Sequence, residues 1–237
     1  MKKLTSYWYV FMLILTMGVT VQSCIDLDDD DDNSNTALTI GTLKIIAGKD
    51  YYFALDNGKK MYPGDTTYIH NYTPLDNQRV FIYFQPLKQP ATGYDYNVQL
   101  YRLENILTKD IIPLTEQTAD SIGDDRINPT NVWITGNYLN IEYQLYTSNN
   151  VDKKHMLNMV INETKTPSDN DSDYFNLEFR HNAYNDKGTT LAWGVVSFRL
   201  DKIADRLSGK KGLKIRYNSI YEGDRYTTVN IGSKSSQ

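Results

Sequence analysis

The sequence predicts an all-β protein: a small barrel followed by a β-sandwich, with at most short helices. From Ala37 onward, apolar and polar residues alternate with a period of two, which is typical of strands that have one buried face. Asn, Asp, Gly and Pro interrupt this alternation at short intervals, as turns between short strands require. The 237 residues are enough for one large domain or two small ones.

The composition excludes several classes of protein. Hydrophobic residues make up 40% and charged residues 23%, so the chain is not disordered throughout. The 25 Lys and Arg against 29 Asp and Glu give a net charge of −4, whereas a dedicated nucleic-acid binder usually carries a strongly basic face. The one cysteine, Cys24, excludes an internal disulfide and a thiolate metal cluster. Tyrosine is unusually frequent, with 19 Tyr against 7 Phe and 3 Trp.

Residues 1–23 are predicted to be a lipoprotein signal peptide. Two lysines at the amino end precede a mostly apolar run at 7–21, which is shorter than the ~20 residues that span a bilayer. The run ends in Val-Gln-Ser-Cys at 21–24, which resembles a bacterial lipobox with Gln22 in place of the usual small residue. The resemblance implies cleavage before Cys24 and lipidation of its sulfur, which anchors such proteins in outer-membrane lipid. The alternative is an ordinary signal peptide beside an unmodified thiol.

Residues 24–36 are predicted to be an acidic tether. Six carboxylates in seven residues repel one another and cannot pack, so the segment is expected to be extended. They are Asp26, Asp28, Asp29, Asp30, Asp31 and Asp32. A calcium loop is the weaker interpretation, because no glycine separates the acidic residues. The arrangement resembles the surface-export signal of Bacteroides-type lipoproteins, which implies display on the outer face of the outer membrane. These six residues account for the acidic excess, because the chain from Asn33 onward carries 23 acidic and 23 basic residues.

Residues 37–114 are predicted to form the barrel domain. Strands are expected at 38–45, 51–55, 60–62, 79–87 and 94–103. Asp-Asn-Gly at 56–58 predicts a tight turn between the second and third strands, because Asn and Gly tolerate positive φ. In the fourth strand, Val80, Ile82 and Phe84 are expected to face the core. This number of short strands in about 75 residues suits a small barrel.

Residues 115–131 are polar and predict a linker, and residues 132–237 are predicted to form the sandwich domain. Strand candidates lie at 132–135, 138–146, 155–161, 174–179, 192–200, 213–217 and 226–231. One short helix fits 201–207, where Ile203 and Leu207 are four residues apart. Seven short strands with turns between them suit a β-sandwich of immunoglobulin-like size.

Several fragments of the chain resemble the NigD-like family of lipoproteins. They are Tyr51–Asp56, Gln78–Val80, Asn105–Ile112, Asp120–Gly123, Trp133–Asn140 and Leu177–Tyr184. The resemblance covers both predicted domains and implies an N-terminal OB-like barrel followed by an immunoglobulin-like β-sandwich. The family takes its name from a bacteriocin-associated operon, which implies a role near bacteriocin production or immunity. The resemblance brings no catalytic residues, since none is established for the family.

The sequence contains no Gly-x-Ser-x-Gly elbow, no phosphate-binding glycine loop and no His-Glu-x-x-His motif. None of its three histidines, His70, His155 and His181, has a second His or Cys at ligand spacing. We therefore expect no catalytic residues, no metal and no other cofactor. A zinc site assembled from distant strands and a hydrolase with two remote carboxylates are alternatives that sequence patterns do not test.

The segment 178–186 is the most charged and aromatic motif of the chain. One interpretation is a binding edge formed by Arg180, His181 and Tyr184. The favoured alternative is a strand end in which Glu178 and Arg180 share one side, followed by a turn that contains two asparagines.

Two short motifs, at 65–67 and 120–122, resemble the acceptor for O-glycosylation in Bacteroides-type envelopes. The resemblance implies modification of Thr66 and Ser121. Both residues are expected in loops, where a glycan is accommodated without disturbing a strand.

Two hypotheses of function follow. The first is a non-enzymatic, surface-exposed lipoprotein that binds a protein or peptide partner and is associated with bacteriocin production or immunity. The second is a glycan-binding accessory lipoprotein, because the OB fold presents such ligands with a binding face. Under this second hypothesis, exposed tyrosines stack on the sugars. The alternative is that the tyrosines lie half-buried on the solvent-facing sides of the sheets. Nucleic acid is not expected as a partner, because the barrel has aromatic residues without a marked excess of basic charge.

Overall fold

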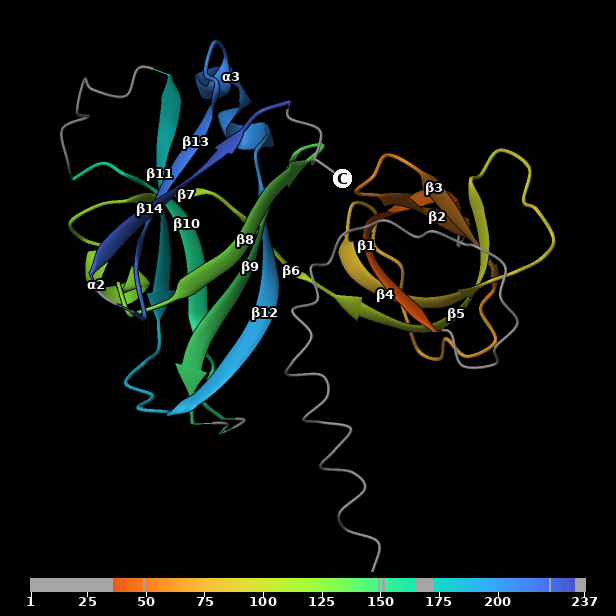
Figure 1. The fold of residues 1–237 in the computed structure, drawn as a ribbon, viewed down its shortest axis with the longest axis horizontal. Helices are drawn as coiled ribbons and strands as arrows, with labels where there is room; N and C mark the ends of the chain where they lie inside the picture. The colour runs from red at the N-terminus through yellow and green to blue at the C-terminus, as the bar shows by residue number, and fades with distance from the viewer. Residues whose placement is uncertain are drawn as a thin grey trace, which may run out of the picture.

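The computed structural model describes residues 36–232, except 49, 149, 151, 165–172 and 222. Within these ranges the chain forms two β domains that lie side by side (Figure 1). The predicted signal peptide, the lipidation site Cys24 and the acidic tether lie outside the described residues. Over the part of the chain that is described, no helix has the length and apolar character needed to cross a membrane.

The first domain is a closed barrel with the strand order β1-β2-β3-β5-β4. Its strands are β1 (Ala37–Ala47), β2 (Asp50–Leu55), β3 (Lys60–Asp65), β4 (Arg79–Pro86) and β5 (Tyr96–Asn105). β3 and β5 pair in parallel, and the other neighbours pair antiparallel. The OB-like barrel predicted for this part of the chain is confirmed.

The alternation along the strands fills the interior of the barrel. The predicted inward residues of β4, Val80, Ile82 and Phe84, are fully buried, as is Phe53 on β2. Burial of each of these side chains contributes about 1.5–3 kcal/mol, so they fix which face of each strand points inward. At the predicted tight turn Gly58 has a φ of 84°, which lets the chain reverse between β2 and β3.

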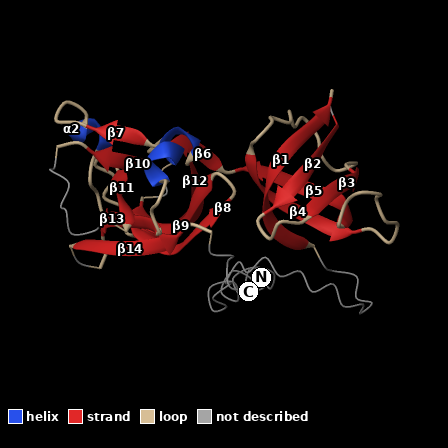
Figure 2. Cartoon of the chain, turned by 90° about the horizontal axis from the view of Figure 1, so that it is seen from above, coloured by secondary structure: helices blue, strands red, loops and turns tan. Residues whose placement is uncertain are grey.

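The second domain is a β-sandwich of two sheets, seen as two layers in Figure 2. One sheet has the order β14-β13-β11-β10-β7 and the other the order β6-β12-β9-β8. The strands are β6 (Leu107–Asp110), β7 (Ile112–Leu114), β8 (Asn128–Thr135), β9 (Tyr138–Thr147), β10 (Met156–Asn162), β11 (Tyr174–Asn182), β12 (Thr190–Arg199), β13 (Gly212–Asn218) and β14 (Asp224–Asn230). The predicted all-β class and the sandwich are therefore confirmed.

The two sheets of the sandwich meet over an aromatic core. Phe179 on β11 packs edge-to-face against Phe198 on β12, with ring centroids 6.0 Å apart. Tyr143 on β9 packs against the same Phe179 at 6.3 Å. Such edge-to-face pairs add about 0.5–1.5 kcal/mol to the free energy gained from burial alone. One aromatic residue of the five-stranded sheet thus contacts two strands of the opposite sheet.

The boundary between the domains falls earlier than the sequence predicts. The barrel was expected to extend over 37–114, but β6 pairs with β12 and β7 pairs with β10, both in parallel and both in the sandwich. The expected linker at 115–131 contains the short helix α2 (Ala119–Ile122) and the start of β8. Ile122 is buried against the sheet and holds α2 in place. The strands β6 and β7 are three or four residues long and pair with distant segments, so local alternation does not reveal which sheet they join.

The short helix predicted at 201–207 is present. The 3-10 turn η1 (Asp201–Ile203) leads directly into α3 (Ala204–Leu207). Ile203 is buried in the sandwich core and Leu207 packs against it, as the four-residue spacing predicts.

Candidate functional site

A buried ion pair of the barrel is hydrogen-bonded to the sandwich. Arg79, at the start of β4, is fully buried and donates two hydrogen bonds to Asp56, of 2.5 and 2.7 Å. The same guanidinium donates to Asn140 Oδ1 on β9 of the sandwich at 3.1 Å. From the sandwich, Trp133 Nε1 donates to Asp56 Oδ2 at 2.8 Å. The bidentate geometry, the added acceptor for Arg79 and the added donor for Asp56 offset the cost of burying the two charges.

Further contacts surround this pair. Ser197 on β12 donates to Asn140 Oδ1 at 2.7 Å, and the Tyr138 hydroxyl donates to the carbonyl of Asn77 at 2.9 Å. The Tyr138 ring also covers the Arg79 guanidinium, whose central carbon lies 5.5 Å from the ring centroid. An apolar layer completes the contact: Ile40, Phe81, Ile106, Trp133 and Val195. We call this set of polar and apolar contacts the domain joint.

A cleft opens beside the domain joint. Its volume is about 390 Å³, and residues from both domains line it. β4 supplies Phe81 and Tyr83, and the chain that leaves the barrel supplies residues 104–107. The sandwich supplies Tyr143 and residues 193–195 of β12. Since the joint fixes the two walls, the cleft is formed before any ligand arrives.

Large apolar side chains are exposed at the mouth of the cleft. Trp193 is 64% exposed and Leu107 is 50% exposed, while Leu191 and Tyr146 are exposed beside them on the four-stranded sheet. Leu191 on β12 and Tyr146 on β9 are direct cross-strand partners. Trp133, by contrast, is half-buried, and its indole N–H donates a hydrogen bond to Asp56. An exposed tryptophan next to a preformed cleft is the arrangement that binding sites favour.

The one carboxylate among the described lining residues is Glu104. It forms an ion pair with Arg102, whose side chain is 67% exposed. Arg102 also lies over the ring of Tyr83, with its guanidinium carbon 5.5 Å from the ring centroid. The charged rim of the cleft therefore helps to hold Tyr83 in place.

The predicted binding edge at 178–186 does not form a common surface. Arg180 pairs with Glu178 and, at 3.0 Å, with Asp124. His181 points to the opposite side of β11 and is buried, while Tyr184 is exposed. Tyr184 has a φ of 48° and the next residue, Asn185, a φ of 60°, so the chain turns here. The arrangement matches the alternative interpretation of a strand end and a turn.

The structure brings together two histidines that the sequence leaves apart. His155 lies just before β10 and diagonally from His181 on β11, whose direct partner is Leu157, and the two rings stack with Nδ1 of the first 2.9 Å from Nε2 of the second. His155 Nε2 lies 3.0 Å from the carboxylate of Asp186. No spacing in the sequence signals this contact, because β-strand register creates it. His70 lies exposed in the segment between β3 and β4.

The hydrogen bonds of this cluster fix where its protons lie. His181 Nδ1 faces the carbonyl of Arg126 at 3.0 Å, so it donates there and its Nε2 accepts from His155. The carboxylate of Asp186 only accepts, and it faces His155 Nε2. Burial lowers the pKa of His181, which keeps its imidazole neutral. The backbone N–H of Ser148 and further hydrogen bonds lower the pKa of Asp186.

Over the described residues, no three His, Cys, Asp or Glu side chains group as a metal site would require.

The two predicted O-glycosylation residues are both exposed. Thr66 follows β3 directly, in a turn where the N–H of Thr67 donates to Asp65. Ser121 lies in α2 rather than in a loop, and its hydroxyl donates to the carbonyl of Thr118.

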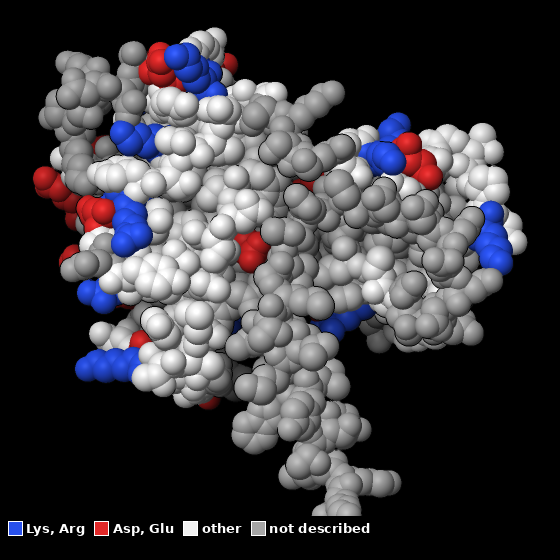
Figure 3. All heavy atoms as spheres, in the orientation of Figure 1, with Lys and Arg blue, Asp and Glu red and all other residues white. Residues whose placement is uncertain are grey.

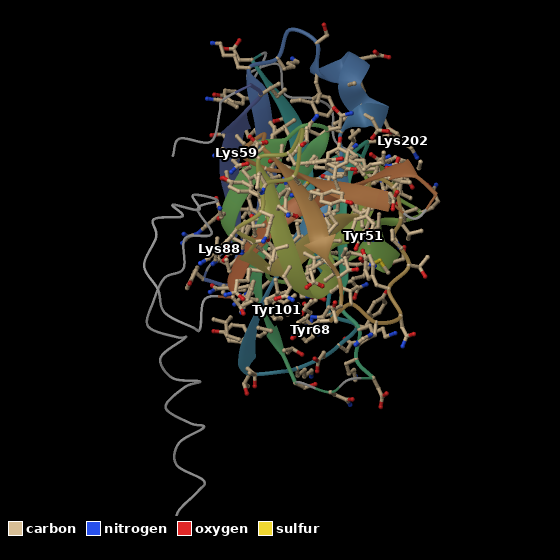
Figure 4. All side chains as sticks on the ribbon, turned by 90° about the vertical axis from the view of Figure 1, so that its right-hand side faces the viewer. Tyr51, Lys59, Tyr68, Lys88, Tyr101 and Lys202 are labelled. Carbon is tan, nitrogen blue, oxygen red and sulfur yellow. The ribbon has the colours of Figure 1, made fainter. Side chains whose placement is uncertain are left out.

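Tyrosines also gather on the outside of the barrel. Tyr94 lies between Tyr52 and Tyr62, with ring centroids 5.7 and 5.0 Å away. Tyr68 stacks on Tyr101 at 5.2 Å with an angle of 20° between the ring planes, and Figure 4 shows the two rings on the same side of the barrel. These tyrosines are distinct from those that line the cleft.

The fold and the domain joint define a class of two-domain β proteins in which an OB barrel is fixed to a sandwich. Residues 40–106 match the NigD-like N-terminal OB domain, and residues 110–231 match the NigD-like C-terminal beta sandwich domain. The chain belongs to the NigD-like family. The two matches meet near residue 106, where the structure places the boundary between the domains.

Three solved structures show how widely the two-domain fold is shared. A protein of unknown function from Bacteroides vulgatus is 26% identical, with 86% of this chain and 95% of that chain covered and a TM-score of 0.71. A NigD-like immunity protein from Bacteroides caccae is 20% identical, with coverage of 83% and 94% and a TM-score of 0.61. A protein described as a candidate lipoprotein from Bacteroides fragilis is 10% identical, with coverage of 83% and 98% and a TM-score of 0.62. The last two likenesses establish the fold alone. The comparison with curated proteins gave no match.

Proposed function

We propose that this protein is a non-enzymatic, surface-exposed lipoprotein that binds a protein or peptide partner in the cleft between its domains, with a role in bacteriocin production or immunity. The observation that carries the proposal is Trp193, which stands 64% exposed at the mouth of a preformed cleft. A tryptophan in water forgoes the free energy that its burial would provide, and binding recovers it. Tryptophan is also among the residues that dominate binding energy at protein interfaces.

The domain joint supports the same proposal. Because the ion pair of Arg79 and Asp56 is hydrogen-bonded to side chains of the sandwich, the walls of the cleft do not have to be ordered when a ligand binds. Rigid walls reduce the entropic cost of association, so a small contact area yields more affinity.

The lining of the cleft favours binding over catalysis. Glycosidase-type hydrolysis needs two carboxylates that face each other across the substrate. Glu104 is the one carboxylate among the described lining residues, and it is engaged with Arg102. A hydrolase with two remote carboxylates is therefore poorly supported at this site.

The proposed location rests on the sequence and on relatives. The lipobox that ends in Cys24 and the acidic run that follows it favour a lipid anchor in the outer membrane and exposure at the cell surface. The relative from Bacteroides fragilis is described as a candidate lipoprotein, which agrees with a lipid anchor. The relative from Bacteroides caccae is called an immunity protein, which favours a role in protection from a toxin.

The proposal includes no nucleic-acid partner. Basic and acidic side chains are interspersed on the face shown in Figure 3. Single-strand binders instead combine stacking aromatic residues with a positive groove.

A second candidate function has its own observation. The tyrosines around Tyr94 and the stacked pair Tyr68 and Tyr101 offer flat rings on the outside of an OB-like barrel. Folds of this type bind oligosaccharides on one face. The alternative function is therefore a glycan-binding accessory protein that uses the barrel rather than the cleft.

Binding of the full chain to a peptide array and to a glycan array separates the two candidates. Trp193→Ala should lower peptide binding about tenfold or more. Tyr226→Ala is the matched control and should leave it unchanged, because Tyr226 is 60% exposed on β14 in the other sheet. Glycan binding that is lost in Tyr94→Ala, and kept in Trp193→Ala, would favour the second candidate. Peptide binding that survives Trp193→Ala would contradict the first.

A further inference from the structure

We propose that the cleft takes an extended, neutral or basic peptide segment, which adds a strand to the free edge of β12. This inference rests on the proposed function and states how the partner is recognised. Its basis is a stretch of β12 that no described strand covers on one side.

β12 pairs with β9 along its whole length, from Thr190 to Arg199. On its other side, β12 pairs with β6 only at 196–199. The described strands therefore leave residues 190–195 without a neighbour on that side, and Figure 1 shows β12 extending well past the end of β6. In an antiparallel pair, every second residue directs its N–H and C=O away from the partner strand. Several backbone donors and acceptors thus face the open side.

The path of the chain from the barrel explains why this edge is free. Continuing the parallel register backward from β6 would place Ile106 opposite Val195. Ile106 instead donates its N–H to the carbonyl of Arg79 in the barrel at 2.8 Å. The chain at 104–106 therefore departs from β12 toward the domain joint, and the cleft lies between the two segments.

This edge lacks the devices that protect the outer strands of both sheets. β7 contains Pro113, β8 contains Pro129 and an irregular register, and β6 and β14 contain charged residues. Such features discourage pairing with another chain. Residues 190–195 read Thr-Leu-Ala-Trp-Gly-Val, with no proline and no charge. Among the described sheet edges of the sandwich, this segment is the one best suited to accept a strand.

The side chains beside the edge favour an alternating apolar peptide. Leu191 and Trp193 are two residues apart, so they project from the same face of β12, and both are exposed. An added strand would place every second side chain next to them, as cross-strand pairs in a sheet do. Tyr146 extends the apolar surface on the neighbouring strand.

The charges around the cleft disfavour an acidic peptide. Glu104 lines the cleft, and Glu142 lies opposite Val195 on β9. The one cation paired with them among the described ion pairs is Arg102, which is exposed and so contributes little. The net negative charge of these residues around the cleft favours a neutral or basic peptide segment as the ligand.

The test uses a phage-displayed library of random twelve-residue peptides selected on the full chain. Selected peptides are synthesised in two forms, N-methylated at even or at odd positions. Strand addition predicts that one form binds about tenfold more weakly for each hydrogen bond removed, while the other binds as the parent does. Trp193→Lys should abolish binding of the parent peptides, and Tyr226→Lys should preserve it.

Three results would overturn the inference. Peptides that depend on Trp193 but tolerate both methylation patterns would contradict strand addition and leave the proposed cleft binding intact. A selection that yields no Trp193-dependent peptide would contradict peptide recognition altogether. Light scattering that shows a dimer, converted to a monomer by Trp193→Lys, would mean that a second copy of the chain occupies the edge instead.

Discussion

Arg79 links the two domains, because its side chain is hydrogen-bonded to residues of both. The sequence places it at the start of a strand and places Asp56 in a turn, and both placements are confirmed. Their ion pair could not be predicted, because it depends on the barrel closing and on Asn140 and Trp133 arriving from the other domain. The fragments that resemble the family include all four residues, so part of that resemblance reflects the domain joint.

Removing one partner of the ion pair should be severe. Arg79→Met leaves the Asp56 carboxylate in the joint without its bidentate partner, which is expected to cost about 3–5 kcal/mol in the free energy of unfolding. Arg102→Met, which removes an exposed ion pair, is expected to cost under about 1 kcal/mol. Urea unfolding measures both, and equal costs would contradict a structural role for the pair. The double variant with Asp56→Leu should recover much of the loss, since no buried charge is then left alone.

The cluster of His155, His181 and Asp186 makes the acid stability of the protein testable. Hydrogen bonds lower the pKa of Asp186 in the folded state, first among them the backbone N–H of Ser148. A carboxylate of this kind contributes stability above its unfolded pKa of about 3.9 and loses that contribution as the pH falls through the folded pKa. Asp186→Asn should therefore lose less Tm than the wild type between about pH 5 and about pH 2. Parallel curves for the two proteins would show that the cluster does not contribute.

At the scale of elements, alternation predicted most of the strands but not which strands pair. The inward set of β4 and the turn at Gly58 follow from local chemistry, and both are confirmed. The short strands β6 and β7 were missed because each pairs in parallel with a strand far along the chain. Local patterns carry no information on such pairing, so the predicted domain boundary fell too late.

Two glycines separate the effect of backbone conformation from that of close packing. Gly123, after α2, has a φ of 74°, and an added Cβ would lie 2.8 Å from the Cβ of Asn182. Gly136, between β8 and β9, has a φ of 53° with open space around it. Gly136→Ala should cost about 1 kcal/mol from the left-handed conformation alone. Gly123→Ala should cost about 2–4 kcal/mol, because α2 must also move away from β11.

Thermal or urea unfolding of the two glycine variants measures this difference. A cost for Gly123→Ala no greater than that for Gly136→Ala would mean that α2 is loosely held. In that case the expected linker at 115–131 would behave as a linker, despite the helix within it.

At the scale of the whole molecule, the sequence predicted the order of the domains but not the site between them. Trp193 falls in a predicted strand, and alternation alone puts it on the face opposite Val196. That face becomes a site because residues 104–107 and β4 approach it, which only the tertiary structure shows. The charged and aromatic composition of 178–186 suggested a binding edge. In the structure, its charged side chains instead form ion pairs within the sandwich.

The proposed anchor is tested by the location of the protein in the cell. Cys24→Ala should move the protein out of the membrane fraction, because the acyl chains that hold such proteins are then absent. Replacing the six aspartates of the tether by asparagine should keep the protein in the membrane fraction but remove its accessibility to protease added to whole cells. A Cys24→Ala protein that stays with the membrane would contradict lipidation as the anchor.

The central claim is that the cleft beside Trp193 binds the functional partner. The most direct measurement is the survival of cells exposed to the bacteriocin that the proposed role requires, after the gene is deleted and replaced by the wild type, by Trp193→Ala or by Tyr226→Ala. The account predicts that the wild type and Tyr226→Ala protect equally and that Trp193→Ala protects no better than the deletion, at equal amounts of surface protein. Full protection by Trp193→Ala, or a deletion that changes nothing, would contradict it.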